Sequence, residues 1–137
     1  GKHLVGDRTQ GKLWQQSTGV STDTDGLGLR RLRRWPGSYA DHKTLFFDRL
    51  EVLFEPGLVG VGLSAPQIEH SYSNDGGKLW TSAGLVSAGE LGDYGRRGFW
   101  TQLGSGRNRL NEIVTTGAVP YRFFGATEDV RPGLELR

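Results

Sequence analysis

The most basic run of the chain extends from Leu27 to Trp35 and contains Arg30, Arg31, Arg33 and Arg34. Guanidinium groups donate paired hydrogen bonds to phosphate oxygens, so these residues are candidates for contact with DNA or with a partner. Proteins that bind single strands also supply interleaved aromatic side chains for base stacking, and none is interleaved here. We therefore favour an exposed strand whose arginine stems cover its neighbours, with at most a weak contact to DNA.

The same run predicts a strand at the edge of a sheet. Side chains alternate along a strand, so one face carries Leu29, Arg31, Arg33 and Trp35, and the other carries Arg30, Leu32 and Arg34. Neither face is purely apolar. Charged residues are typical of edge strands because they oppose pairing with another chain.

Residues that could support catalysis are scattered along the chain. Glycoside hydrolysis needs a carboxylate pair, or an arginine cluster with a tyrosine nucleophile, in one pocket. The candidates are Asp41, Asp48, Glu51, Glu55, Glu69, Asp93 and Tyr94. Their spacing indicates no shared pocket, so we predict that the chain is not an enzyme. The aromatic residues Trp14, Trp35 and Tyr39 leave a carbohydrate-binding or adhesion module as an alternative.

The sequence predicts no metal site and no cofactor. His3, His42 and His70 lack metal-ligand spacing and are interpreted as surface or strand histidines. Asp23 and Asp25 offer the oxygen ligands that calcium prefers, but no glutamate follows at EF-hand spacing, so segment 17–28 is interpreted as a solvated loop. Because the chain has no Cys, disulfides and thiolate ligands are excluded.

Residues 67–80 predict a β-hairpin. Ile68, His70 and Tyr72 alternate with polar residues, which is a strand pattern. The pattern breaks at Asn74-Asp75-Gly76-Gly77, where the glycines allow the positive φ that a tight turn needs.

This hairpin resembles the Asp-box, a motif usually written Ser-x-Asp-x-Gly-x-Thr-Trp. Ser73, Asp75, Gly77 and Trp80 match it, and Leu79 replaces the Thr. We expect Asp75 to accept hydrogen bonds from turn amides and Trp80 to be buried under the turn. The resemblance implies a structural brace, because Asp-boxes of sialidases, other glycosidases and non-enzymatic β-propellers lie away from the catalytic centre. A sialidase-like glycosidase module is the enzymatic alternative that the motif leaves open.

The composition favours an all-β fold with many short strands and tight turns. Of 137 residues, 22 are glycine and only 35% are hydrophobic. The net charge is 17 − 15 = +2, which is too small to indicate nucleic acid binding. No apolar run approaches the ~18 residues of a membrane helix. The chain begins with Gly and contains no Met, so we expect an excised portion of a longer protein.

We divide the chain into a blade-like hairpin at 1–16, a β domain of antiparallel hairpins at 17–126 and a polar tail at 127–137. The longest strand is expected at 44–55, with a bulge near Asp48 and with Leu50, Val52 and Phe54 facing the core. A turn is expected at 104–106, and a closing strand at 119–126 carries Tyr121 and Phe123 on one face. The apolar, glycine-rich connector 57–65 is a candidate contact with a neighbouring subunit.

Segments from His3 to about Ala126 together resemble the C-terminal part of the packaged-DNA stabilisation proteins of short-tailed phages, also called tail hub or nozzle proteins. The resemblance is carried by His-Leu-Val-Gly-Asp at 3–7, Arg30-Arg31, Phe-Asp-Arg-Leu-Glu at 47–51, the hairpin at 73–80, the arginine- and tryptophan-containing segment 92–104, Arg-Asn-Arg at 107–109 and Phe-Gly-Ala at 124–126.

The resemblance implies a non-enzymatic virion protein of the phage tail, present in the host cytoplasm before assembly. Such proteins form a homo-oligomeric ring below the portal and close the portal channel after DNA packaging. Their implied partners are the portal and tail adaptor proteins, the tail needle and the tailspikes. Full-length members contain a β-propeller, which fits the hairpin at 1–16. No catalytic residue and no cofactor are implied.

Overall fold

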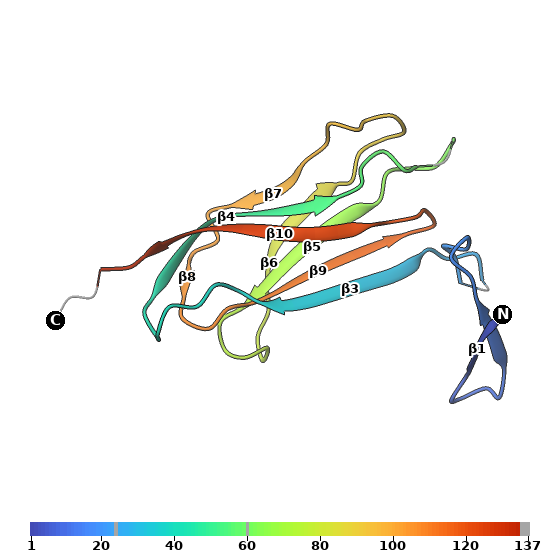
Figure 1. Ribbon diagram of the computed structural model, residues 1–137, viewed down its shortest axis with the longest axis horizontal. Helices are drawn as coiled ribbons and strands as arrows, with labels where there is room; N and C mark the ends of the chain where they lie inside the picture. The colour runs from blue at the N-terminus through green and yellow to red at the C-terminus, as the bar shows by residue number, and fades with distance from the viewer. Residues whose placement is uncertain (24, 60, 135–137) are drawn as a thin grey trace.

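The computed structural model describes residues 1–23, 25–59 and 61–134, and within them it contains ten β-strands and no helix (Figure 1). The strands are β1 His3–Gly6, β2 Leu13–Gln16, β3 Leu29–Pro36, β4 Leu45–Phe54, β5 Gln67–Ser73, β6 Thr81–Ser87, β7 Gly98–Thr101, β8 Ser105–Gly106, β9 Leu110–Gly117 and β10 Phe123–Pro132. The described residues form no helix that is long and apolar enough to span a membrane. The prediction of an all-β fold is confirmed.

Two antiparallel sheets make the body of the molecule. The β4 sheet has the order β10-β4-β7, and β8 pairs with β4 beyond the end of β7. The β9 sheet has the order β3-β9-β5-β6. The sheets pack face to face over one hydrophobic core that draws residues from both, so the fold is a β-sandwich (Figure 1).

Strand β4 supplies the centre of the core, and a bulge decides which of its side chains enter it. The three residues predicted to face the core, Leu50, Val52 and Phe54, are all buried. The pairing with β10 skips Asp48, so the bulge lies where the sequence predicted it. Because the extra residue shifts the alternation, Phe47 is buried, whereas Phe46, which strict alternation places on the face of Leu50, is 43% exposed.

The edge of the sandwich formed by β6 and β7 is closed by a hydrogen bond between the sheets. Trp100 of β7 is buried, and its indole N–H donates to the carbonyl of Gly84 on β6 at 3.0 Å. Ile68 of β5 and Ile113 of β9 are buried against the same core. The opposite edge, formed by β3 and β10, carries the arginine run.

Strand β10 extends beyond the domain end expected at residue 126. The sequence places 127–137 in a polar tail, but β10 pairs with β4 as far as Pro132 opposite Leu45. This part of β10 is polar because it lies at an edge and alternates exposed residues with partly buried ones such as Glu128 and Val130. Residues 135–137 of the expected tail lie outside the described residues. The turn expected at 104–106 is likewise corrected, since Ser105–Gly106 form β8 against β4.

The connector 57–65 folds back on its own chain near both ends. Val59 and Ala65 are buried with Val119 in a second small cluster. At the tip, Val61 is 90% exposed and Leu63 is 50% exposed, while residue 60 lies outside the description. The exposed apolar surface of the connector is therefore confined to its tip.

The N-terminal strands form a hairpin that lies beside one end of the sandwich (Figure 1). β1 pairs with β2 from His3 opposite Gln16 to Gly6 opposite Leu13, as predicted for residues 1–16. Its apolar side chains are largely in solvent, with Leu4 60% and Leu13 73% exposed. In segment 17–28, of which residue 24 is not described, a bridge between Thr22 and Gly28 leads into β3.

Candidate functional site

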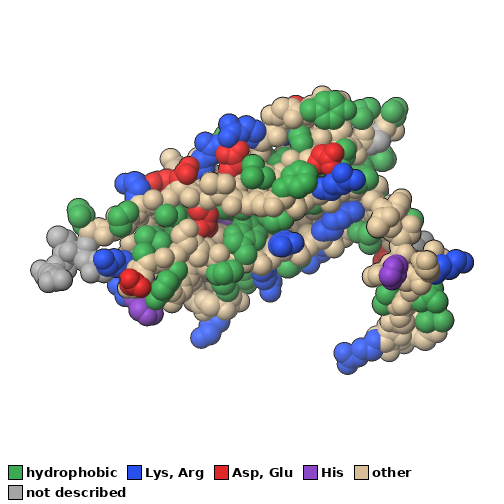
Figure 2. All heavy atoms as spheres, in the orientation of Figure 1, with side chains coloured by type: hydrophobic (Ala, Val, Ile, Leu, Met, Phe, Trp, Pro, Cys, Tyr) green, Lys and Arg blue, Asp and Glu red, His purple; other side chains and the backbone are tan. Residues whose placement is uncertain are grey.

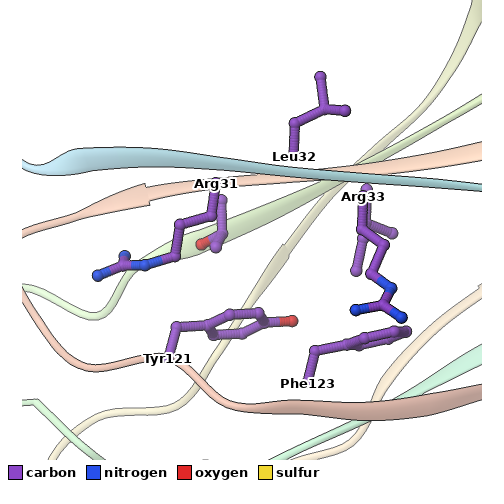
Figure 3. Close-up of a pocket in the computed structure, with 7 residues that line it drawn as sticks. Arg31, Leu32, Arg33, Tyr121 and Phe123 are labelled. Carbon is purple, nitrogen blue, oxygen red and sulfur yellow. The ribbon is translucent and has the colours of Figure 1, made fainter. Parts of the chain in front are cut away.

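The arginine run forms β3, and β3 is an edge strand, as predicted. In the described chain its neighbour in the β9 sheet is β9 alone. Arg31 and Arg33 point from β3 towards Tyr121 and Phe123, whereas Leu32 points away from them (Figure 3). The arginines of β3 thus lie on two opposite faces of the sheet, and so the four do not form one phosphate-binding cluster.

An open cavity of about 270 Å³ lies below this edge, between β3 and the start of β10. We call it the edge cavity; its lining residues are Arg31, Leu32, Arg33, Ile113, Thr115, Tyr121 and Phe123. The sequence predicted Tyr121 and Phe123 on one face of a strand at 119–126, but β10 begins only at Phe123, so Tyr121 lies in the segment before it. No local pattern indicated that the two rings would lie opposite the arginines.

The polar groups that line the edge cavity differ in the interactions that they make with the rest of the protein. Arg31 donates to the carbonyl of Gly117 at 3.4 Å and to that of Val119 at 3.1 Å. The guanidinium of Arg33 lies 5.5 Å from the ring centre of Phe123. The hydroxyl of Tyr121 is buried without a hydrogen-bond partner among the described residues, and burial raises the pKa of Tyr121 to about 12. The cavity therefore offers an unused hydroxyl beside two cations.

On the outer face of β3, Arg34 is already engaged. It pairs with Glu112 of β9, and its guanidinium lies 4.8 Å from the ring centre of Trp80. Arg30 is exposed. Lys and Arg side chains are spread over the visible face of the molecule rather than gathered in one patch (Figure 2). This distribution does not resemble the continuous basic surface of a nucleic-acid-binding protein.

The hairpin between β5 and β6 is held by Ser73 and Asp75. The carboxylate of Asp75 accepts hydrogen bonds from the backbone N–H of Lys78 at 2.9 Å and of Leu79 at 3.0 Å. The Ser73 hydroxyl donates to Asp75 at 2.7 Å and accepts from the N–H of Gly77 at 3.0 Å. These bonds hold the pKa of Asp75 below its usual value, with the bond from Leu79 as the largest cause.

The expectation that Trp80 is buried is wrong. The side chain is only partly buried, because its outer face is covered by the guanidinium of Arg34 rather than by apolar core. Its indole N–H donates to the carbonyl of Gly77 at 3.1 Å. Trp80 therefore closes the turn at the surface of the sandwich.

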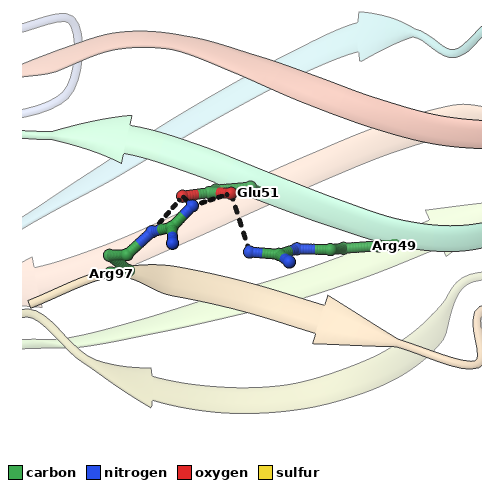
Figure 4. Close-up of polar contacts among 3 residues, drawn as sticks. All are labelled: Arg49, Glu51 and Arg97. Carbon is green, nitrogen blue, oxygen red and sulfur yellow. Dashed lines mark hydrogen bonds and ion pairs between the residues drawn. The ribbon is translucent and has the colours of Figure 1, made fainter.

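Four of the six acidic residues considered for catalysis are held by arginines, each in a separate place. Glu51 accepts from Arg49 at 2.8 Å and from Arg97 at 2.7 and 2.8 Å (Figure 4). The other ion pairs are Asp48 with Arg131, Glu55 with Arg122 and Asp93 with Arg96. Glu69 accepts from the hydroxyl of Ser82, Tyr94 is exposed, and Asp41 lies in a loop before β4.

The described parts of the chain contain no group of three His, Asp or Glu residues that could hold a metal ion. His3 lies in β1, His42 contacts the ring of Tyr39, and His70 is buried. The aromatic residues Trp14, Trp35 and Tyr39 lie on different elements, and Trp35 packs on Phe123 with ring centres 5.9 Å apart.

Sequence reasoning missed a polar network inside the sandwich. Nε2 of the His70 ring lies 3.1 Å from Oδ1 of Asn111, and Asn111 donates to Glu128, which also accepts from the N–H and hydroxyl of Ser38. Burial is the largest cause that holds the pKa of His70 below its usual value. The period-2 pattern identified the inward face of His70 but not the polar partners that other strands bring to it.

Arg109 is the other buried polar residue that the sequence did not reveal. Only 2% of it is exposed, and its guanidinium lies 3.9 Å from the ring centre of Phe47 and 4.1 Å from that of Tyr72. Its Nε donates to Asn74 at 3.0 Å. Because Phe47 and Tyr72 belong to different sheets, Arg109 ties the two layers together.

Comparison with known proteins identifies the family of the sandwich. No curated protein matches the chain. A family model described as "Bacteriophage P22 Gp10, beta-sandwich" matches residues 30–130, well over half of the chain, and this range contains β3 to β9 and most of β10. The chain therefore belongs to the bacteriophage P22 Gp10 beta-sandwich family, and it is a structural β-sandwich domain of a phage tail hub protein.

Proposed function

We propose that this domain helps to close the portal channel of a short-tailed phage after DNA packaging, and so keeps the packaged DNA inside the capsid. The family match over residues 30–130 is the observation that carries the proposal. The isolated ion pairs of the candidate acidic residues support a structural role, because each carboxylate of a pair such as Glu51 with Arg97 is already neutralised by an arginine.

Within the tail, the protein that carries this chain is proposed to form a homo-oligomeric ring. Its partners would be the portal and tail adaptor proteins, the tail needle and the tailspikes. A closed ring of identical subunits uses two different patches on each subunit. The tip of connector 57–65, with Val61 exposed, and the edge strand β3 are the two patches that we propose.

The N-terminal hairpin is proposed to belong with a propeller region of the same protein. A single hairpin cannot bury its apolar side chains, and here Leu4 and Leu13 are exposed. Neighbouring blades would cover these residues. In the same proposal, Ser73, Asp75, Gly77 and Trp80 form an Asp-box that fixes the hairpin between β5 and β6 and takes no part in chemistry.

Retention of packaged DNA in assembled particles tests the function. We would prepare particles in which the parent protein is wild type, lacks residues 30–130, or carries Arg109→Ala, with Arg107→Ala as the matched control at an exposed arginine nearby. The proposal expects the deletion of residues 30–130 and Arg109→Ala each to increase release of DNA on mild heating. The control Arg107→Ala should behave as wild type. Particles that assemble without residues 30–130 and retain DNA normally would refute it.

A further inference from the structure

Strand β3 leaves one edge of the β9 sheet open. At the end of β3, the N–H of Gly37 donates to the carbonyl of Arg109 at 2.7 Å, and the register places Gly37 opposite Arg109, so the backbone groups of Gly37 point towards β9. Backbone groups alternate between the two sides of a strand in an antiparallel sheet, so those of Arg30, Leu32 and Arg34 point away from β9. Throughout the described chain, no strand pairs with β3 on that side. These groups can accept an added strand.

The edge cavity lies directly beneath that open edge. Arg31 and Arg33 project into it from β3, and Tyr121, whose hydroxyl is unpaired among the described residues, lines it from the segment just before β10 (Figure 3). Carbonyl groups bind Arg31 without neutralising its charge. Arg33 has a ring contact with Phe123 and no ion pair with any described residue. The cavity thus combines positive charge and a free hydroxyl donor with apolar walls.

We propose that the open edge of β3 and the edge cavity together bind an extended acidic segment of a partner protein. The segment adds to the β9 sheet as a strand next to β3. Residues directly opposite in neighbouring strands share a face, so the residue opposite Arg33 points into the cavity. A glutamate at that position packs its methylene groups on Phe123, and its carboxylate accepts hydrogen bonds from Arg33 and Tyr121.

The size and charge of the site select this occupant over others. A cavity of about 270 Å³ is smaller than most pockets for small-molecule ligands and suits one or two side chains. A second copy of β3 would place arginine opposite arginine, which is unfavourable. A nucleic acid backbone stays outside the sandwich, where Arg34 is already paired with Glu112. This site does not depend on the proposed role in DNA retention, although a segment bound there takes the β3 edge that the ring proposal assigns to a neighbouring subunit.

Binding of synthetic peptides to the full 137-residue chain tests the proposal. The probe is a fluorescent peptide of the length of β3 that alternates Glu and Val, so that one face is acidic when it is extended. The controls are the same peptide with Gln in place of Glu, the same peptide N-methylated at alternate positions to block strand pairing, and a single-stranded DNA oligonucleotide of equal charge. Anisotropy gives the affinities, and amide NMR shifts locate the site.

The variants compare two arginines on opposite faces of the same strand. We expect Arg33→Glu to weaken binding of the Glu peptide by about tenfold or more, and Tyr121→Phe to weaken it by a smaller factor. Arg30→Glu makes the same charge change outside the cavity and should have little effect beyond a salt-sensitive loss. Circular dichroism confirms that each variant is folded, and a variant that is unfolded is replaced by Arg33→Gln.

Three results would overturn the proposal. These are no binding of the Glu peptide, equal losses for Arg33→Glu and Arg30→Glu, and equal binding of the N-methylated peptide. Tighter binding of the oligonucleotide than of the Glu peptide, with NMR shifts at β3, would assign the edge to nucleic acid instead.

Discussion

Removing the guanidinium of Arg109 should destabilise the sandwich more than any change at an exposed arginine. The group is stacked between Phe47 and Tyr72, with ring-centre distances of 3.9 and 4.1 Å, and it donates to Asn74. Two desolvated ring contacts and the charged hydrogen bonds to Asn74 and to the carbonyl of Ser105 are lost in Arg109→Ala, while the cost of burying the cation is recovered. The net loss in unfolding free energy should be about 3 kcal/mol. For a domain of this size, that lowers Tm by roughly 10 °C.

Urea and thermal unfolding, followed by circular dichroism, measure this effect. Arg107→Ala is the matched control, because Arg107 is exposed and its one hydrogen bond to a described residue is that to Thr44, at 3.3 Å. Its change should stay within about 0.5 kcal/mol. Arg109→Lys should retain little of the stability, since an ammonium cannot stack on both rings. The reasoning is refuted if Arg109→Ala and Arg107→Ala melt at the same temperature.

Three further outcomes follow from the geometry. Trp80→Ala should cost only about 1–2 kcal/mol in urea unfolding, because the ring is partly exposed, and a loss as large as that of a buried tryptophan would contradict this. The pKa of His70 lies below its value of 6.5 in an unfolded chain, so the folded state is stabilised above pH 6.5 and loses stability as the pH falls below it. Unfolding at about pH 7.5 and 5.5 should show this dependence, and His70→Gln should remove it. Binding to DNA, measured by gel mobility shift, should be weak and should vanish as salt rises; a tight, sequence-dependent shift would disprove it.

Local patterns predicted the strands that carry alternating apolar residues, and they failed where pairing partners decide the structure. In β4, the alternation of Leu50 and Val52 was sufficient to predict the core. The burial of Phe47 depends on the register of β10 across the bulge, which no local pattern contains. Residues 127–132 are polar because β10 lies at an edge, and so their sequence is hard to distinguish from that of a loop.

The candidate site was predictable in its parts but not in its assembly. Charge alternation indicated that β3 lies at an edge, and the turn residues indicated the hydrogen bonds of Asp75. The meeting of Arg33 with Phe123, and of Arg34 with Trp80, depends on the packing of strands that are distant in sequence. For the same reason, Arg109 gave no sign that it would be buried.

Cryo-electron microscopy of the virion that contains the parent protein tests the central claim most directly. The claim is that this sandwich is a structural part of a tail hub ring that closes the portal channel. We expect density for residues 30–130 as a β-sandwich, repeated around a ring beneath the portal. Absence of the protein from the tail, or its isolation as a secreted protein that cleaves glycans, would contradict the claim.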